Sequence, residues 1–209
     1  MIIAGVLLDK LGSDILKKLG VKDSKMLFPK ERERLALEIK KIVLDFEIIK
    51  ILPKEIDNAV KTPGYNLNKL EAAKMAEAVN RLTESDKTKD AKVTIYVDCP
   101  SNNILAWRNV LLGFVQRKDL HFMVEHKADV NHVACSAASI LAKVTRNEEI
   151  EKLKKQYDFD CGSGYPSDPN CVRFLKTDRV NELAEKGVIR TSWKTFKNSH
   201  AGKKQKTLF

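Results

Sequence analysis

Two aspartates stand where short apolar segments end, and both could do chemistry. Asp98 closes the β-branched segment Lys92–Asp98, and Asp129 follows the apolar segment His121–His126 by a few residues. If these segments are neighbouring strands, the two carboxylates emerge at the same edge of a sheet, where α/β folds place their ligands. Carboxylate oxygens are ligands that Mg²⁺ and Mn²⁺ prefer. The alternative is that each aspartate caps the turn or helix that follows it, which is common.

The stretch after Asp129 has the composition of a closely packed helix. Small side chains recur in it, at Ala134, Ser136, Ala137, Ala138, Ser139 and Ala142. An acid beside a helix N-terminus also lies where partial positive charge favours anions. Alone, this pattern indicates a core helix preceded by an acid, and it acquires a functional meaning only beside Asp98.

The net charge points toward a polyanionic partner. The 209 residues carry 38 Lys and Arg against 28 Asp and Glu, a formal net charge of +10. Nucleic acid is the commonest polyanion, although a basic protein without such a partner would show the same charge. Together with two acids, the charge favours metal-assisted hydrolysis of a phosphodiester. In that chemistry one metal activates a water and another stabilises the leaving oxygen.

Other kinds of site have no support in the sequence. It contains no Gly-rich phosphate loop followed by Lys, and no GxGxxG, HExxH or GxSxG pattern. The four cysteines lack zinc-like spacing, which favours reduced thiols in a cytoplasmic protein. His132, the histidine near a candidate acid, is interpreted as a surface or capping residue. No apolar run has the length of a membrane span, and no secretory signal is recognised.

Apolar periodicity predicts an α/β domain in which strands and helices alternate. Strands are expected at residues 2–8, 46–52, 92–98 and 121–126. Helices are expected at residues 14–19, 29–42, 66–82, 101–112 and 133–157, the first of them capped by Ser13. Two more helices, at residues 170–175 and 179–186, are expected in a C-terminal region without strands.

The Gly-rich turn Cys161–Asp168 is a further candidate for ligand contact. Gly162 and Gly164 allow the backbone to approach a ligand, and Tyr165 offers a flat ring for stacking on a sugar or base. The alternative is an ordinary connection between helices with a packed tyrosine, and the turn by itself favours that alternative.

Several motifs, in order along nearly the whole chain, resemble those of ribonuclease HII of the archaeal type. They are LGVKDSK (19–25), EID (55–57), NLNKLE (66–71), YVD (96–98), AD (128–129), SAASILAKV (136–144), GSGYPSDP (162–169) and SWKT (192–195). The resemblance implies a ribonuclease H-like fold, with a mixed sheet flanked by helices. It also implies endonucleolytic cleavage of the RNA strand of RNA–DNA hybrids, leaving 3′-hydroxyl and 5′-phosphate ends. Such an enzyme would support removal of RNA primers and misincorporated ribonucleotides.

The resemblance also implies roles for single residues. The family binds two Mg²⁺ or Mn²⁺ ions with four acidic residues, and Asp98 and Asp129 match two of the four. Both are therefore expected to be catalytic and metal-binding. Tyr165 matches the tyrosine that packs against the sugar at the RNA–DNA junction.

Basic residues are the expected contacts with partners. Lys25, Lys143 and Arg146 fall in motifs near the substrate backbone and are expected to contact the phosphates of a hybrid or of DNA containing ribonucleotides. An ordinary solvated charge is the alternative for each. The tail Gln205–Phe209 resembles the start of a sliding-clamp binding box, for which a solvated basic tail is the alternative.

One motif of the family is missing. The other two acids belong to Asp-Glu-x-Gly-Arg-Gly-Pro, which in the family lies on the first strand, just before a segment resembling residues 2–8. This motif occurs nowhere in the 209 residues. Its Gly-Arg-Gly turn reads the ribose 2′-hydroxyl, and loss of a central strand would leave its neighbours with unpaired backbone groups. We expect that the sequence is a fragment or that translation begins upstream of Met1. The alternative function is a catalytically inactive, hybrid-binding remnant.

The expected organisation has three parts. Residues 1–160 would form the ribonuclease H-like catalytic domain without its first strand, residues 161–198 a C-terminal helical region, and residues 199–209 a basic flexible tail. A cytoplasmic monomer that does not bind a membrane is expected.

Overall fold

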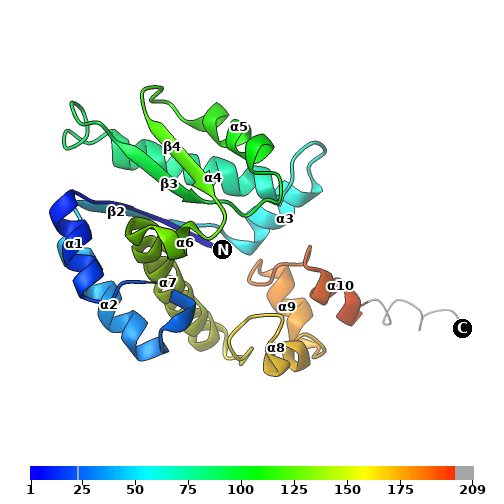
Figure 1. Ribbon diagram of the computed structural model, residues 1–209. Helices are drawn as coiled ribbons and strands as arrows, with labels where there is room; N and C mark the ends of the chain where they lie inside the picture. The colour runs from blue at the N-terminus through cyan, green and yellow to red at the C-terminus, as the bar shows by residue number, and fades with distance from the viewer. Residues whose placement is uncertain (23, 201–209) are drawn as a thin grey trace, which may run out of the picture. The chain divides into compact units, whose positions relative to one another are not determined.

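The computed structural model describes residues 1–22 and 24–200, in which helices separate the successive strands and further helices follow the last strand (Figure 1). The elements are β1 (Ile2–Leu7), α1 (Lys10–Lys18), the 3₁₀ turn η1 (Ser24–Met26), α2 (Pro29–Ile42), β2 (Asp45–Lys50), α3 (Pro53–Lys61), α4 (Leu67–Thr83), β3 (Thr94–Asp98), α5 (Ile104–Phe114), β4 (His121–Glu125), α6 (Ala128–Asn131), α7 (Val133–Tyr157), α8 (Pro169–Phe174), α9 (Arg179–Glu185) and α10 (Lys194–His200). The prediction of an α/β fold is confirmed.

Helix α1 begins earlier than the sequence predicts. Its N-cap is Asp9, whose Oδ1 accepts a 2.7 Å hydrogen bond from the amide of Gly12. The predicted cap at Ser13 is wrong, because the side chain of Asp9 already satisfies a free N–H of the first turn.

Helix α3 follows β2 and was not predicted. Strand β2 ends at Lys50, and Pro53 opens α3 at a position where the missing N–H of proline costs nothing. Leu52 is the extended N-cap residue of this helix, so the predicted strand through Leu52 is two residues too long.

The strands form two pairs. β1 and β2 are antiparallel, with Ile2 opposite Lys50, and β3 and β4 are parallel, with Asp98 opposite Glu125. The pairing is thus mixed, as predicted. Within the described residues, however, no hydrogen-bonded ladder joins the two pairs. Each strand therefore pairs on one side only.

The described chain divides into two compact units. The sheet unit comprises Ile2–Lys50 and Asn68–Thr145, and the helical unit comprises Met1, Ile51–Leu67 and the described residues from Arg146 on. Helix α7 contributes to both units. The predicted domain boundary at residue 160 stays a prediction. Residues 199 and 200 of the predicted tail belong to α10, and residues 201–209 lie outside the described part of the chain.

Two apolar clusters form the core of the sheet unit. In one, α1, α2 and α7 pack with β1 and β2, and Leu16, Leu35 and Ile140 are fully buried there. In the other, α4 and α5 cover β3 and β4 around Trp107 and Leu111 (Figure 1). Burial of these side chains stabilises the sheet unit by removing apolar surface from water. The clusters thereby fix the strand ends that carry the candidate acids.

The helical unit has its own small core. Cys171, Leu175 and Val180 are buried in it, and Phe174 and Phe196 pack against them. Within the described residues, no helix has the length and apolar character that crossing a membrane requires.

Candidate active site

Asp98 lies at the carboxyl end of β3. Strand β3 pairs in parallel with β4, so Asp98 stands opposite Glu125, and the amide of Cys99 continues the ladder with a 2.9 Å hydrogen bond to the carbonyl of Glu125. Pro100 follows and cannot donate to a ladder. The strand therefore stops with the side chain of Asp98 exposed at the sheet edge.

Asp129 is brought to the same edge by a tight turn after β4. Lys127 adopts a left-handed backbone with φ of 61°, and α6 begins at Ala128. The amide of Ala128 donates a 3.2 Å hydrogen bond to Oδ1 of Asp98, which ties the two acid-bearing segments together. The two strands are neighbours, which is the condition under which the two aspartates were expected to meet, and both aspartates lie at one edge.

The two carboxylates differ in their surroundings. Asp129 is only 4% exposed, and its Oδ1 is buried without a hydrogen-bond partner within the described residues. Its Oδ2 lies 3.7 Å from Nζ of Lys25. Partial burial and the negative charge of Asp129 raise the pKa of Asp98 above its ordinary value. Burial and the neighbouring carboxylate thus disfavour the ionised form of Asp98.

A buried carboxylate oxygen without a partner fits a divalent cation. Such ions take oxygen ligands, and an unsatisfied buried oxygen is otherwise costly. Within the described residues, no group of three or more His, Cys, Asp or Glu side chains lies close enough to hold an ion. Asp98 and Asp129 therefore present part of a ligand set, with room for oxygens from other sources.

A thiol that sequence analysis did not assign to the site stands beside the acids. Cys135 donates a 3.2 Å hydrogen bond from Sγ to the carbonyl of Tyr96 in β3. Burial, followed by the charges of Asp98 and Asp129, raises the pKa of Cys135 to about 12. Cys135 is therefore a neutral thiol. No spacing pattern in the sequence indicated that this cysteine lies beside the two acids.

Lys143 is held in the sheet unit by two serines. Its Nζ donates to Oγ of Ser24 and, at 3.2 Å, to Oγ of Ser139, and the two hydroxyls lie 3.0 Å apart. Ser24 is fully buried and directly precedes Lys25. The cluster therefore ties Lys143 to the segment that carries Lys25. The spacing of Ser139 and Lys143, one helical turn apart, is the signal that could have revealed part of it.

His132 ends helix α6, and its ring packs against a side chain of strand β3. Its ring stacks on that of Tyr96 with centroids 4.0 Å apart, and its Nε2 lies 3.1 Å from Oε1 of Glu125. The interpretation as a capping residue is confirmed, since His132 is the C-cap residue of α6 and its amide donates a 2.9 Å hydrogen bond to the carbonyl of Ala128. The sequence did not reveal that the ring also packs between a strand side chain and a carboxylate.

Tyr165 and Arg146 belong to the helical unit, where they contact each other. The guanidinium carbon of Arg146 lies 3.7 Å from the centroid of the Tyr165 ring. Tyr165 is 45% exposed, so part of the ring remains available. The turn around it is fixed by Asp168, whose carboxylate accepts hydrogen bonds from the amides of Ser163 at 2.7 Å and Asn170 at 2.8 Å.

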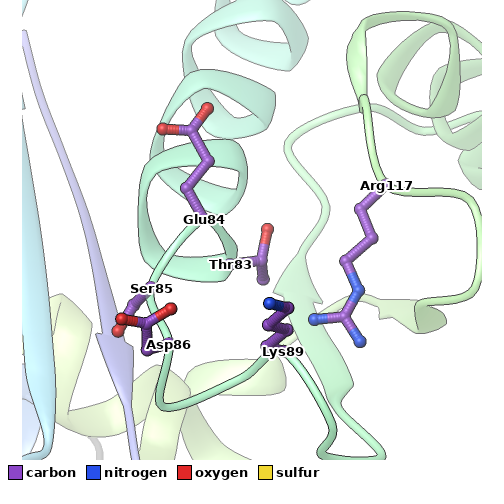
Figure 2. A pocket seen from close by; sticks show the side chains of 6 residues that line it. All are labelled: Thr83, Glu84, Ser85, Asp86, Lys89 and Arg117. Carbon is purple, nitrogen blue, oxygen red and sulfur yellow. The ribbon is translucent and has the colours of Figure 1, made fainter.

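A cavity of about 380 Å³ in the sheet unit contains none of these residues. Both signs of charge line it, from Thr83, Glu84, Ser85, Asp86, Lys89 and Arg117 (Figure 2). Its most basic side chain is already engaged, since Arg117 donates to the carbonyl of Thr88 at 2.7 Å and to Asp119. The candidate active site is thus an open sheet edge rather than this cavity.

Comparison with solved structures defines the class of fold. The chain is similar to ribonuclease HII in the structure of its complex with PCNA from Archaeoglobus fulgidus, with a TM-score of 0.75 and 36% identity, covering 99% of this chain and 90% of that one. It is also similar to ribonuclease H2 from Pyrococcus horikoshii, with a TM-score of 0.75 and 30% identity, covering 98% and 100%. The fold is ribonuclease H-like.

Sequence comparison defines the family within that class. The model of the Ribonuclease HII family matches residues 1–196. Ribonuclease HII of Pyrococcus furiosus is 39% identical over 197 residues, which cover 94% of this chain and 83% of the relative. This chain belongs to the ribonuclease HII family.

Proposed function

We propose that this chain hydrolyses the RNA strand of RNA–DNA hybrids, leaving 3′-hydroxyl and 5′-phosphate ends, with Mg²⁺ or Mn²⁺ as cofactor. Removal of RNA primers and of misincorporated ribonucleotides would be its biological use. The observation that carries the proposal is the pair formed by Asp98 and Asp129 at the end of two parallel strands, with Oδ1 of Asp129 buried and unpartnered in the described structure. Membership of the ribonuclease HII family supports the same reaction.

Asp98 and Asp129 would hold the cations through their carboxylate oxygens. Two bound divalent ions would supply an activated water and charge stabilisation at the leaving oxygen. Asp98 is oriented for this role by the amide of Ala128, and Asp129 by the buried turn that follows β4. Both side chains are thus placed before a substrate binds, which lowers the cost of assembling the site.

The basic side chains would bind the hybrid through its phosphates. Lys25 already lies 3.7 Å from Asp129, so a phosphate held near Lys25 would be close to the acids. Lys143 is oriented by Ser24 and Ser139. The ring of Tyr165, exposed on the helical unit, would pack against the sugar at the junction.

Cleavage of a labelled hybrid tests this function. Purified protein is incubated with an RNA–DNA duplex carrying labelled RNA, with Mg²⁺ or Mn²⁺, and the product ends are identified. We expect cleavage by the wild-type chain and a loss of at least about a hundredfold in Asp98→Asn and Asp129→Asn, as for removal of a group that acts in the transition state. The matched control is Asp14→Asn, since Asp14 is half-buried on α1, away from the site, and its ion pair in the described contacts is with Lys10.

A second candidate function is hybrid binding without cleavage. It is favoured by the sequence itself, which lacks the Asp-Glu-x-Gly-Arg-Gly-Pro motif. The same assay separates the two functions when binding is measured in parallel. Metal-dependent cleavage that Asp98→Asn abolishes rejects the second candidate. Binding with no cleavage in either metal rejects the first when the protein tested also carries the Asp-Glu-x-Gly-Arg-Gly-Pro motif, because the 209 residues alone lack two of the four acids.

A sliding clamp is a proposed protein partner. The relative from Archaeoglobus fulgidus was solved as a complex with PCNA. In this chain the matching segment would be Gln205–Phe209, which lies outside the described residues. Co-purification with a clamp, lost when residues 205–209 are deleted, would support the contact. Unchanged co-purification of the deleted protein would reject it. Gel filtration of the same samples tests the predicted monomer.

A further inference from the structure

The guanidinium of Arg146 covers the ring of Tyr165. Its central carbon lies 3.7 Å from the ring centroid, the separation of a stacked cation–π pair. Arg146 lies on α7, and Tyr165 follows the Gly-rich turn of the same helical unit. Arg146 thus covers one face of the ring, while Tyr165 as a whole stays 45% exposed.

Arg146 is also tied to the turn itself. Its Nη1 donates a 2.6 Å hydrogen bond to the carbonyl of Ser163, two residues before Tyr165, and a 3.2 Å bond to Oδ1 of Asn147. The guanidinium therefore uses its flat face on the ring and one of its nitrogens on the backbone next to the ring. These contacts commit much of the side chain to the protein.

The backbone of the turn is shaped to permit this contact. Gly164 has a φ of +68°, and a Cβ at this position would lie 3.2 Å from Nη2 of Arg146 and 3.3 Å from Cδ1 of Ile150. The absence of a side chain lets the turn press onto α7. Asp168 holds the other side of the turn by accepting from the amide of Ser163 at 2.7 Å.

We infer that Arg146 is a positioning residue, which holds the ring of Tyr165 so that its free face is presented to the sugar of the bound hybrid. Arg146 acts through Tyr165 and not by binding a phosphate. The inference rests on the proposed function for its ligand, and on the described contacts for its geometry. A ring that is already oriented loses less conformational freedom on binding, so affinity is gained before any new contact forms.

The two roles of Arg146 make opposite predictions for substitution. A phosphate contact depends on charge, so Arg146→Lys would retain binding. Arg146→Gln would reduce the slope of log affinity against log salt concentration by the contribution of about one phosphate contact. A positioning role depends on the planar guanidinium, which Lys cannot replace.

Hybrid affinity is measured in an Asp98→Asn background to prevent cleavage. The control is Arg34→Lys, because Arg34 is exposed on α2 and pairs with Glu31.

We expect Arg146→Lys and Arg146→Gln to weaken binding about threefold to tenfold, the range of a cation–π contact, with an unchanged salt slope. In a Tyr165→Ala background, Arg146→Lys should have no further effect, since the two residues act as one unit. Wild-type affinity of Arg146→Lys, a reduced salt slope of Arg146→Gln, or additive effects would each overturn the inference.

A second measurement tests the stacking without a substrate. The four tyrosines are replaced by 3-fluorotyrosine, and the ¹⁹F resonance of residue 165 is assigned with Tyr165→Phe. We expect Arg146→Lys to move this resonance and leave the other three in place. An unmoved resonance overturns the positioning role. If the resonance moves but the protein binds no hybrid, the proposed function is rejected. The sugar is then also rejected as the ligand of Tyr165, while the contact between Arg146 and Tyr165 is still supported.

Discussion

The amide of Ala128 donates a 3.2 Å hydrogen bond to Oδ1 of Asp98, so the acid at the end of β3 is fastened to the segment that carries Asp129. The bond joins residues thirty positions apart in the chain. It orients Oδ1 of Asp98 toward the backbone of the turn that follows β4. Asp129, one residue after Ala128, is thereby held next to Asp98 without any direct bond between the two carboxylates.

Removing the charge of Asp129 should stabilise the metal-free protein while it destroys the site. Asp129→Asn relieves repulsion with Asp98 and removes a buried charge whose Oδ1 has no described partner. We expect the free energy of unfolding to rise by about 0.5–2 kcal/mol, as for other relief of charge conflict at functional sites. Urea denaturation in the presence of a chelator measures it, with Asp14→Asn as control. Destabilisation of Asp129→Asn by more than the control would contradict this view of the pair.

Gly164→Ala should weaken both the turn and hybrid binding. The new methyl group would meet Nη2 of Arg146 at 3.2 Å, in a backbone with φ of +68° that alanine rarely adopts. We expect a loss of about 1–2 kcal/mol of stability together with lower affinity for a hybrid. The matched control is Gly113→Ala in α5, where the added methyl group would meet no described atom within 4 Å apart from its chain neighbours and the backbone of its own helix. That change should instead stabilise by about 0.5–1 kcal/mol.

Asp57 should be a main determinant of stability in the helical unit. Its buried carboxylate accepts from the amide and hydroxyl of Thr191, at 2.8 and 2.5 Å, and from the amide of Ser192 at 2.9 Å. Burial alone would raise the pKa of Asp57, but these hydrogen bonds outweigh it and lower the pKa. We expect Asp57→Ala to cost about 2–4 kcal/mol, because it leaves three half-buried donors on Thr191 and Ser192 without their acceptor. The exposed Asp160→Ala is the comparison, and equal effects of the two substitutions would refute the prediction.

Acid should weaken the turn through Asp168. Hydrogen bonds from the backbone and hydroxyl of Ser163, and from the amide of Asn170, lower the pKa of Asp168 from 3.8 to about 2. A depressed pKa means that the folded state favours the carboxylate. The resulting stability is present above about pH 3.8 and is lost as the pH falls through about 2. Unfolding of wild type and Asp168→Asn is compared from pH 5 to pH 2. The difference between the two free energies of unfolding should become smaller as the pH falls. A difference that stays constant would show that the charge of Asp168 does not contribute to stability.

The sequence predicted the parts of the site that depend on local pattern. Short β-branched segments marked β3 and β4, and their expected adjacency placed Asp98 and Asp129 at one edge. It could not predict the bond from Thr191 to Asp57, which spans 134 positions and has no periodicity. The sequence also did not show that the guanidinium of Arg146 stacks on Tyr165. The spacing of residues along a helix does not reveal which side chain from a later turn packs against that helix.

Mn²⁺ binding tests the metal site most directly. Free Mn²⁺ is measured by electron paramagnetic resonance during titration of the wild-type chain, Asp98→Asn, Asp129→Asn and the control Asp14→Asn. Asp98 and Asp129 are proposed to hold the ion together, so each substitution should remove binding that wild type and control retain. Equal Mn²⁺ binding by Asp129→Asn and wild type would contradict the assignment of this sheet edge as the active site.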